Sequence, residues 1–150
     1  MQKINKLIAT LFYLGYLPIA PGTISSLIGV GFYLIIKDNL LLHLISFFIL
    51  LFAGLWSSSR MEEYFGSKDP SQIVIDEFTA ILLVYIFIPF NIKLLVVGFV
   101  LFRIFDIFKI PPIKQIQQLP KGWGIMVDDI SCAIFTNIIL HVLRFFGIFF

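Results

Sequence analysis

Residues 39–59 read NLLLHLISFFILLFAGLWSSS, a stretch of 21 residues without a charged side chain. An α-helix rises about 1.5 Å per residue, so a helix of this length reaches about 30 Å. That is the thickness of the hydrocarbon core of a lipid bilayer. The stretch therefore predicts a helix that spans a membrane, and it sets the class of fold expected for the rest of the chain.

The composition of the chain agrees with a membrane protein. Of its 150 residues, 59% are hydrophobic and 13% are charged, whereas soluble domains carry roughly 25% charged residues. A soluble core of this size cannot bury so much apolar surface, so part of the solvent must be lipid. The net charge of +2 and the absence of a basic tract argue against a nucleic-acid partner. We expect a single membrane-embedded domain over residues 1–150.

Several other apolar segments predict further helices. Pro18, Pro21 and Gly22 interrupt the first uncharged run, because proline restricts the backbone before it and glycine loosens it. Pro89 ends another apolar segment in the same way. The expected helices cover residues 3–15, 24–36, 39–59, 78–88, 92–105 and 129–149, with polar connections at 60–77 and 107–128.

These segments predict an all-α fold, a polytopic integral membrane helical bundle with about four short transmembrane helices. The N-terminal helix is expected to lie at the membrane interface or to enter the membrane. The helix over residues 24–36 reaches about 20 Å, which is less than the hydrocarbon core. It must therefore rely on its neighbours or on local thinning of the bilayer.

The basic residues indicate the orientation of such a bundle. With a cytoplasmic N-terminus and one crossing per apolar unit, eight basic residues lie inside and three outside, as the positive-inside tendency requires. Every acidic residue except Asp38 then lies inside as well, so the polar groups gather at the cytoplasmic face. The inside set is Lys3, Lys6, Arg60, Lys68, Arg103, Lys109, Lys114 and Lys121, and the outside set is Lys37, Lys93 and Arg144.

Two pairs of adjacent carboxylates stand directly before uncharged segments. Asp76 and Glu77 precede FTAILLVYIFI, and Asp128 and Asp129 precede ISCAIFTNIILHVL. Acidic residues at a helix start satisfy free backbone N–H groups and suit the helix dipole, so capping is one interpretation. The other is that the pairs converge on a divalent metal ion. Oxygen ligands without Cys or His suit Mg²⁺ or Mn²⁺ better than Zn²⁺.

A third charged motif lies between the two pairs, in FRIFDIFK (102–109). Arg103, Asp106 and Lys109 recur every three residues, so a helix places them on one face. A solvated ladder of ion pairs is one interpretation. The alternative is an anion site, because polar groups at the end of a membrane helix are costly and usually functional.

Carboxylates that hold a metal, together with Arg and Lys that hold an anion, predict phosphoryl transfer. The five candidate metal ligands are Asp76, Glu77, Asp106, Asp128 and Asp129, and these residues with Arg103 and Lys109 are the candidate catalytic set. Cys132, His43 and His141 lie within apolar runs, where packing or hydrogen bonding between helices is the expected role. Water, activated by the metal or by a carboxylate, is therefore the expected nucleophile, and direct attack by an Asp is the alternative.

Four motifs together carry a family resemblance. LPIAPGTISSL (17–27), DPSQIVIDEF (69–78), FRIFDIFKIPPI (102–113) and GWGIMVDD (122–129) occur in this order. From about residue 10 to 135 the chain resembles the phosphatidylglycerophosphatase A family of bacterial membrane lipid phosphatases. The resemblance implies Mg²⁺-dependent hydrolysis of phosphatidylglycerophosphate to phosphatidylglycerol and phosphate. It also implies a cytoplasmic or inner membrane, with the active site facing the cytoplasm.

The resemblance also points to individual positions. The matching ones are Pro21, Gly22, Thr23, Ser26, Asp69, Asp76, Glu77, Arg103, Asp106, Lys109, Pro112, Gly122, Gly124, Asp128 and Asp129. The expected substrate-binding residues are Thr23, Ser26, Arg103, Lys109 and Lys121. Ser25, Ala80, Lys121 and Ala133 stand where the family tends to have Gly, and Ile110 where it tends to have Pro. These departures concern packing and turns.

A second class of function remains open. A small membrane transporter or channel would use a cluster of carboxylates to bind a cation, with charged groups lining an ion pathway. Such a pathway needs polar residues through the depth of the bilayer. The sequence instead collects its polar residues at one face, which favours an enzyme.

Overall fold

The computed structural model describes residues 2–109, 111 and 113–148, and it is all-α with no strand in these ranges. Ile110 and Pro112 lie outside the described residues. The all-α prediction is therefore confirmed for the part of the chain that is described. The helices are α1 (Gln2–Ala9), the 3₁₀-helix η1 (Leu14–Tyr16), α2 (Pro21–Ile36), α3 (Leu40–Phe65), α4 (Ile75–Val84), α5 (Ile92–Phe108), α6 (Ile113–Ile116) and α7 (Gly122–Phe145).

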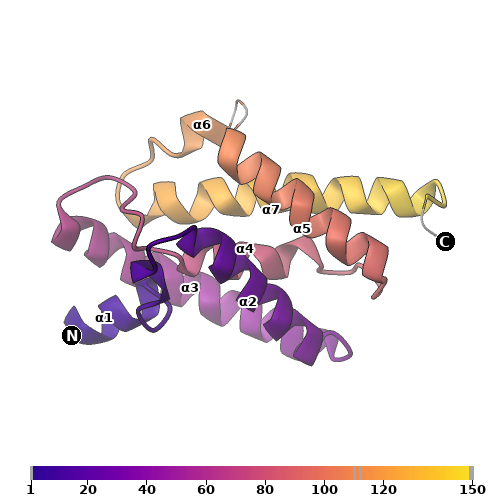
Figure 1. Ribbon diagram of the computed structural model, residues 1–150, viewed down its shortest axis with the longest axis horizontal. Coiled ribbons are helices and arrows are strands. Elements are labelled where there is room, and N and C mark those ends of the chain that lie inside the picture. The colour runs from indigo at the N-terminus through magenta and orange to yellow at the C-terminus, as the bar shows by residue number, and fades with distance from the viewer. Residues whose placement is uncertain (1, 110, 112, 149–150) are drawn as a thin grey trace.

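The longer helices run roughly along the long axis of the molecule, and successive ones reverse direction (Figure 1). Helix α4 is at the centre, where it contacts α2, α3, α5 and α7. Eight of its ten residues are buried. The starts of α2, α4 and α7 and the end of α5 consequently meet at the same end of the bundle.

A glycine allows α2 to lie close to α4. A Cβ atom at Gly29 would collide with the side chain of Ile81 and would lie 3.1 Å from the carbonyl oxygen of Phe78. Small residues that let helix backbones approach are typical of helix packing in membranes. This close approach fixes the position of the start of α2 relative to that of α4.

Helices α3 and α7 are long and apolar enough to cross a membrane, with mean hydropathy of 2.2 and 1.6 in their most apolar windows. Only 22% of that window is buried in α3, so its apolar side chains, including Ile49 and Phe52, lie mainly on the surface. Helix α2 is a shorter apolar helix. Two helices in the described ranges therefore have the length of a span, and the four-span arrangement stays a prediction.

Several predicted boundaries were wrong, among them those of α4, which covers Ile75–Val84 rather than 78–88. The segment 60–77 is not a continuous connection, because α3 extends to Phe65 and α4 starts at Ile75. Helix α7 starts at Gly122 rather than 129. The helix expected over residues 3–15 ends at Ala9, since Leu11, Phe12 and Tyr13 have positive φ angles that a right-handed helix excludes.

Helix α4 ends inside the bundle, and side chains of its neighbours bind the carbonyl groups left free there. The ring Nε2 of His43 lies 3.0 Å from the carbonyl oxygen of Leu82. The amide of Asn137 donates to the carbonyl oxygens of Val84 at 2.9 Å and Ile86 at 3.0 Å. Backbone groups in lipid must be satisfied within the protein. The hydrogen-bonding role expected for His43 is thus confirmed.

Candidate active site

A cavity of about 440 Å³ opens at the end of the bundle where α2, α4, α5 and α7 meet. The carboxylates of α4 and α7 face the cations of α5 across it. Most of the residues predicted to form a site line this cavity, namely Thr23, Asp76, Glu77, Arg103, Asp106, Lys109 and Asp129. The structure therefore brings together motifs that are separated by up to about a hundred residues in the sequence.

Three carboxylates form the centre of the site. Asp76, Glu77 and Asp129 each present an oxygen atom within 4.8 Å of the others. Asp76 is 6% exposed and Asp129 is 1% exposed. One oxygen of each, Asp76 Oδ1, Glu77 Oε2 and Asp129 Oδ2, is buried without a hydrogen-bond partner among the residues that the structure describes.

Three buried acceptors at this spacing fit a divalent cation. Burial raises the pKa of Asp76 well above its ordinary range, and the neighbouring charges of Glu77 and Asp129 raise it further. Burial likewise raises the pKa of Glu77, to about 7. The ionised form of the cluster is therefore unfavourable without a cation, because the cluster contains only carboxylates and no side chain that would balance their charge. Hard oxygen ligands of this kind suit Mg²⁺, so the three carboxylates fit this ion.

The helix boundaries decide between capping and metal binding for the second carboxylate pair. Because α7 starts at Gly122 and its N-cap is Lys121, Asp128 and Asp129 lie in the second and third turns, beyond the free N–H groups of a helix start. Capping is therefore excluded for this pair. Asp76 and Glu77 do lie in the first turn of α4, whose N-cap residue Val74 makes no side-chain cap.

Asp128 and Asp129 point to different partners. Neighbouring residues on a helix are rotated by about 100°, so Asp129 joins the carboxylate cluster while Asp128 accepts a hydrogen bond from Lys109 Nζ at 2.5 Å. Burial alone lowers the pKa of Lys109, but Asp128 and Asp129 outweigh it and hold the pKa above its ordinary value. Lys109 is therefore a permanent cation. The structure places Asp128 beside this cation rather than in the cluster.

Arg103 forms the other cationic side of the cavity. Its Nη1 atom is 2.7 Å from Asp106 Oδ2 and donates to Ser26 Oγ at 3.3 Å. Its Nε atom is buried without a partner in the described part of the chain. Asp106 is thus engaged by Arg103, and Arg103 retains donor capacity for a ligand.

A glycine at the start of α2 makes room for this arrangement. A Cβ atom at Gly22 would collide with the carboxylate of Glu77 and would lie 3.7 Å from Arg103 Nη2. The Pro-Gly-Thr motif is therefore explained by a close approach: Pro21 begins the helix, and Gly22 leaves space for the carboxylate and the guanidinium.

Three of the predicted site residues, Ser26, Asp128 and Lys121, do not line the cavity, and Asp69, which was not in the predicted set, does. Lys121 lies 3.7 Å from Glu63 and lines a different cavity, between α3 and α7. Asp69, which the candidate set omitted, lines the active-site cavity, accepts a hydrogen bond from Gln117 at 2.6 Å and lies 3.8 Å from Lys109. Its place in the matched DPSQIVIDEF motif was the signal that could have identified it.

Comparison with known proteins gives one family. The family model described as phosphatidylglycerophosphatase A matches residues 7–144. A Bacteroides thetaiotaomicron protein named "Putative phosphatidylinositol-3-phosphatase" is 32% identical over 147 residues, covering 92% of both chains. Two proteins named phosphatidylglycerophosphatase A, from Haemophilus influenzae and Escherichia coli, are each 32% identical. These alignments cover 93% and 90% of this chain and 88% and 80% of the relatives. No solved structure matches.

Proposed function

Because the chain belongs to the phosphatidylglycerophosphatase A family and is a phosphatase, we propose that it hydrolyses phosphatidylglycerophosphate to phosphatidylglycerol and inorganic phosphate. The observation that carries this proposal is the cavity in which three carboxylates face Arg103 and Lys109, each carboxylate having one buried oxygen without a hydrogen-bond partner among the described residues. A divalent cation is complementary in charge to the carboxylates, and a phosphomonoester is complementary in charge to Arg103 and Lys109.

Asp76, Glu77 and Asp129 would hold Mg²⁺. When bound there, this ion lowers the pKa of water and screens the charge of the phosphate. Asp76 and Glu77 come from the first turn of α4, and Asp129 comes from α7, which packs against α4. The carboxylates of Asp106 and Asp128 have a different task, since each binds and orients a cation of α5.

Arg103 and Lys109 bind the phosphate oxygens. Arg103 presents a planar guanidinium that can grip two oxygens, and Lys109 adds a point charge. The interactions of both side chains with the phosphate strengthen as negative charge develops on the phosphoryl group. The oxygen of water forms a bond to phosphorus while the bond from phosphorus to the glycerol oxygen breaks. One proton of the water passes to the glycerol oxygen, which yields the free hydroxyl of phosphatidylglycerol.

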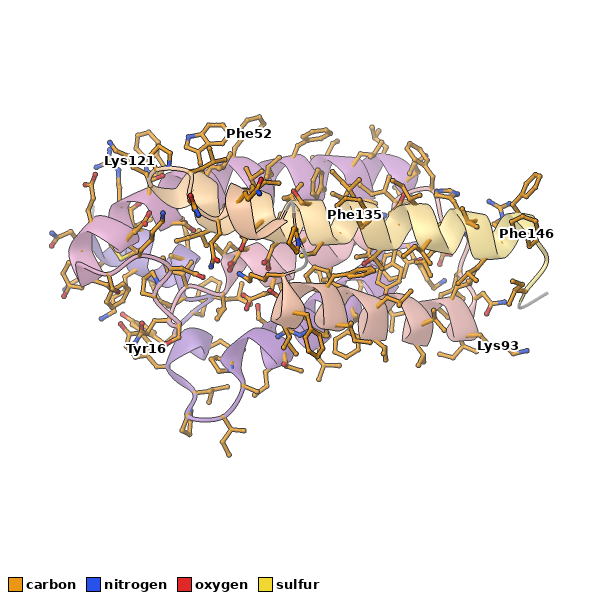
Figure 2. The ribbon with its side chains drawn as sticks, turned by 90° about the horizontal axis from the view of Figure 1, so that it is seen from above. Tyr16, Phe52, Lys93, Lys121, Phe135 and Phe146 are labelled. Atoms are coloured by element: carbon orange, nitrogen blue, oxygen red, sulfur yellow. The ribbon has the colours of Figure 1, made fainter. Side chains whose placement is uncertain are left out.

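The proposed reaction takes place at the cytoplasmic face of a membrane. The active-site cavity and Lys121 lie at one end of the bundle, and Lys93 lies at the other (Figure 2). The larger set of basic residues belongs to the active-site end, as the positive-inside tendency favours. Large apolar side chains exposed along the bundle, such as Ile35 and Ile49, suit contact with acyl chains.

A cation pathway is a weaker fit than an enzyme. Within the described residues, the carboxylate cluster is confined to one end, whereas His43 and Asn137 in the middle of the bundle bind backbone carbonyls. An ion pathway requires polar groups along the whole route.

The test is phosphate release by the purified full chain in detergent micelles. We expect release from phosphatidylglycerophosphate with Mg²⁺ and none with excess EDTA. Phosphatidylinositol 3-phosphate serves as the second substrate, because one relative carries that activity in its name. Preferential release from the inositol lipid would replace the proposed substrate, and full activity in EDTA would refute the metal requirement.

A further inference from the structure

A second cavity, of about 520 Å³, lies between α3 and α7. It shares no lining residue with the active-site cavity. We call it the α3–α7 groove and define it by Phe52, Trp56, Arg60, Glu63, Lys121 and Trp123. The start of α7 is held against α3 by a hydrogen bond from the backbone N–H of Gly122 to Ser59 Oγ, at 3.1 Å. The groove is thus a fixed feature of the packing of these two helices.

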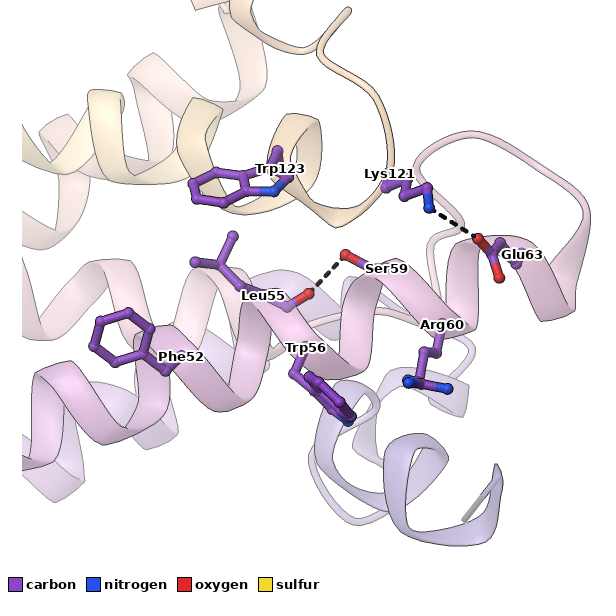
Figure 3. Close-up of a pocket in the computed structure, with 8 residues that line it drawn as sticks. All are labelled: Phe52, Leu55, Trp56, Ser59, Arg60, Glu63, Lys121 and Trp123. Atoms are coloured by element: carbon purple, nitrogen blue, oxygen red, sulfur yellow. Dashed lines mark hydrogen bonds and ion pairs between the residues drawn. The ribbon is translucent and has the colours of Figure 1, made fainter.

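The groove changes from apolar to charged along its length. Figure 3 shows Phe52 at one end and Arg60, Glu63 and Lys121 at the other. From Phe52 to Glu63 the helix advances by about 16 Å, which matches the distance from the upper acyl chain to the headgroup region of one bilayer leaflet. The groove therefore has the polarity profile of a single lipid leaflet.

Its aromatic side chains are open to the surroundings. Phe52 is 65% exposed, and Trp56 and Trp123 are each 55% exposed. Tryptophan is enriched at the interface between acyl chains and headgroups. The guanidinium of Arg60 lies 4.5 Å from the centre of the Trp56 ring, so a cation is held at the junction of the apolar and charged parts.

The charged end carries two cations and one carboxylate. Lys121 lies 3.7 Å from Glu63, and both side chains are about two-thirds exposed, so this pair is weak. The remaining positive charge favours an anionic ligand. A second copy of the chain is a poorer occupant of the groove. A two-fold dimer in a membrane would bring residues of equal depth together, so the cations of one copy would repel those of the other.

We propose that the α3–α7 groove binds an anionic phospholipid of the surrounding bilayer. Its phosphodiester group contacts Arg60 and Lys121, and one acyl chain lies along Trp123 and Phe52. The lipid here is a bound ligand and not the molecule being hydrolysed, since the carboxylate cluster is in the other cavity. This inference rests on the membrane location given under the proposed function.

The chain provides its own probe for this site, because its two tryptophans, Trp56 and Trp123, both line the groove. The full chain is reconstituted in phosphatidylcholine vesicles that contain a low mole fraction of a lipid with brominated acyl chains, which quench tryptophan fluorescence. We expect stronger quenching by brominated phosphatidylglycerol than by brominated phosphatidylcholine at the same mole fraction. Equal quenching by the two lipids would overturn the proposal.

The Arg60→Gln variant tests the role of the cation. One basic residue near a membrane surface contributes about fivefold to anionic lipid binding, so the preference for phosphatidylglycerol should fall by about that factor. Lys3→Gln, at an exposed position of α1 outside the groove, is the matched control and should keep the preference. A preference that survives in Arg60→Gln and in the double variant Arg60→Gln/Lys121→Gln would contradict the assignment.

Two further readouts keep the test independent of folding and of the enzymatic reaction. In the unaltered chain, high salt should reduce the preference by screening the exposed cations, and a preference insensitive to salt argues against the site. Phosphate release is measured on the same vesicles. A chain that shows the lipid preference without hydrolysis would refute the proposed function alone, and hydrolysis without the preference would refute the groove alone.

Discussion

Adjacent residues with the same side chain have different roles at the active site. Asp129 is part of the three-carboxylate cluster and has an oxygen without a hydrogen-bond partner in the described part of the chain, whereas Asp128 binds Lys109. The sequence predicted that both would bind metal. It could not separate them, because the direction of a side chain depends on where the helix starts and on the rotation of that helix against its neighbours.

Asp129→Asn and Asp128→Asn should therefore change different properties of the protein, turnover in the first case and stability in the second. Asn at 129 keeps the shape but removes a charged metal ligand, so turnover should fall by about 100-fold or more. It also relieves repulsion within the cluster, so the melting temperature in EDTA should rise while the stabilisation by Mg²⁺ shrinks. The measurement is turnover and thermal unfolding in detergent across a Mg²⁺ titration.

Asn at 128 should instead weaken the hydrogen bond to Lys109 and leave this half-buried cation poorly balanced, which costs roughly 1–3 kcal/mol. Stability should fall with and without Mg²⁺, and the Mg²⁺ concentration for half-maximal turnover should change little. If both variants show the same shift in Mg²⁺ dependence, Asp128 also binds the metal and the division of roles is wrong.

The positions of charged residues were easier to predict than their contacts. The pattern FRIFDIFK correctly placed Arg103 and Asp106 on one face, where they form an ion pair. Lys109 departs from this ladder because it is the C-cap residue of α5 with a left-handed φ of 41°, and its ammonium group pairs with Asp128 of α7. A change of backbone direction at one residue has no signature in residue spacing.

At the scale of helices, the error at the start of α7 has a physical explanation. Pro120, Gly122 and Gly124 are typical of a loop, so the sequence predicted a start at 129. Gly122 is instead a helical residue at a point of contact, because a Cβ atom there would lie 2.7 Å from Ser59 Oγ. Glycine for a turn and glycine for close packing cannot be distinguished in one sequence.

Two glycines of α2 provide a matched pair of substitutions. Gly22→Ala should force Glu77 to move and should lower both turnover and stability, since the added Cβ collides with its carboxylate. At Gly31 a Cβ atom meets nothing within 4 Å, so Gly31→Ala should keep activity and raise stability by up to about 1 kcal/mol. Phosphate release and thermal unfolding of both variants check this. Wild-type turnover in Gly22→Ala would show that the close approach has no catalytic consequence.

The side-chain amide of Asn137 stabilises the internal end of α4 by donating to two backbone carbonyls there. Asn137→Leu should leave the carbonyls of Val84 and Ile86 without this donor, at a cost of about 1–3 kcal/mol in unfolding free energy. Thr136→Val is the control, because the Thr136 hydroxyl donates to the carbonyl of Cys132 within its own helix and not to the end of α4. Thermal unfolding in detergent compares the two. Equal stability of these variants would mean that other groups satisfy the end of α4.

At the scale of the whole molecule, the arrangement predicts which segments face the cytoplasm. Cysteines at Ser67 and Gln118, both exposed at the active-site end, should be inaccessible to an impermeant thiol reagent in intact cells. A cysteine at the exposed Lys93, at the opposite end, should react. The background is Cys132→Ala, which removes the single natural cysteine. Labelling of Ser67→Cys from outside the cell would show that the topology is the reverse of the predicted one.

The shortness of α4 has a consequence for how the protein is made. Ten residues extend about 15 Å, and with Asp76 and Glu77 at one end they form a poor signal for insertion as the chain leaves the ribosome. The donor that completes its other end, Asn137, is synthesised later, within α7. For a chain that folds into a bilayer, α4 should therefore take its place only after α7 has been translated. The test places a tag in the connection after α4. In a chain that ends before Gly122, we expect the tag to stay on the cytoplasmic side, where protease can reach it. In the full chain, we expect the tag to be translocated across the membrane.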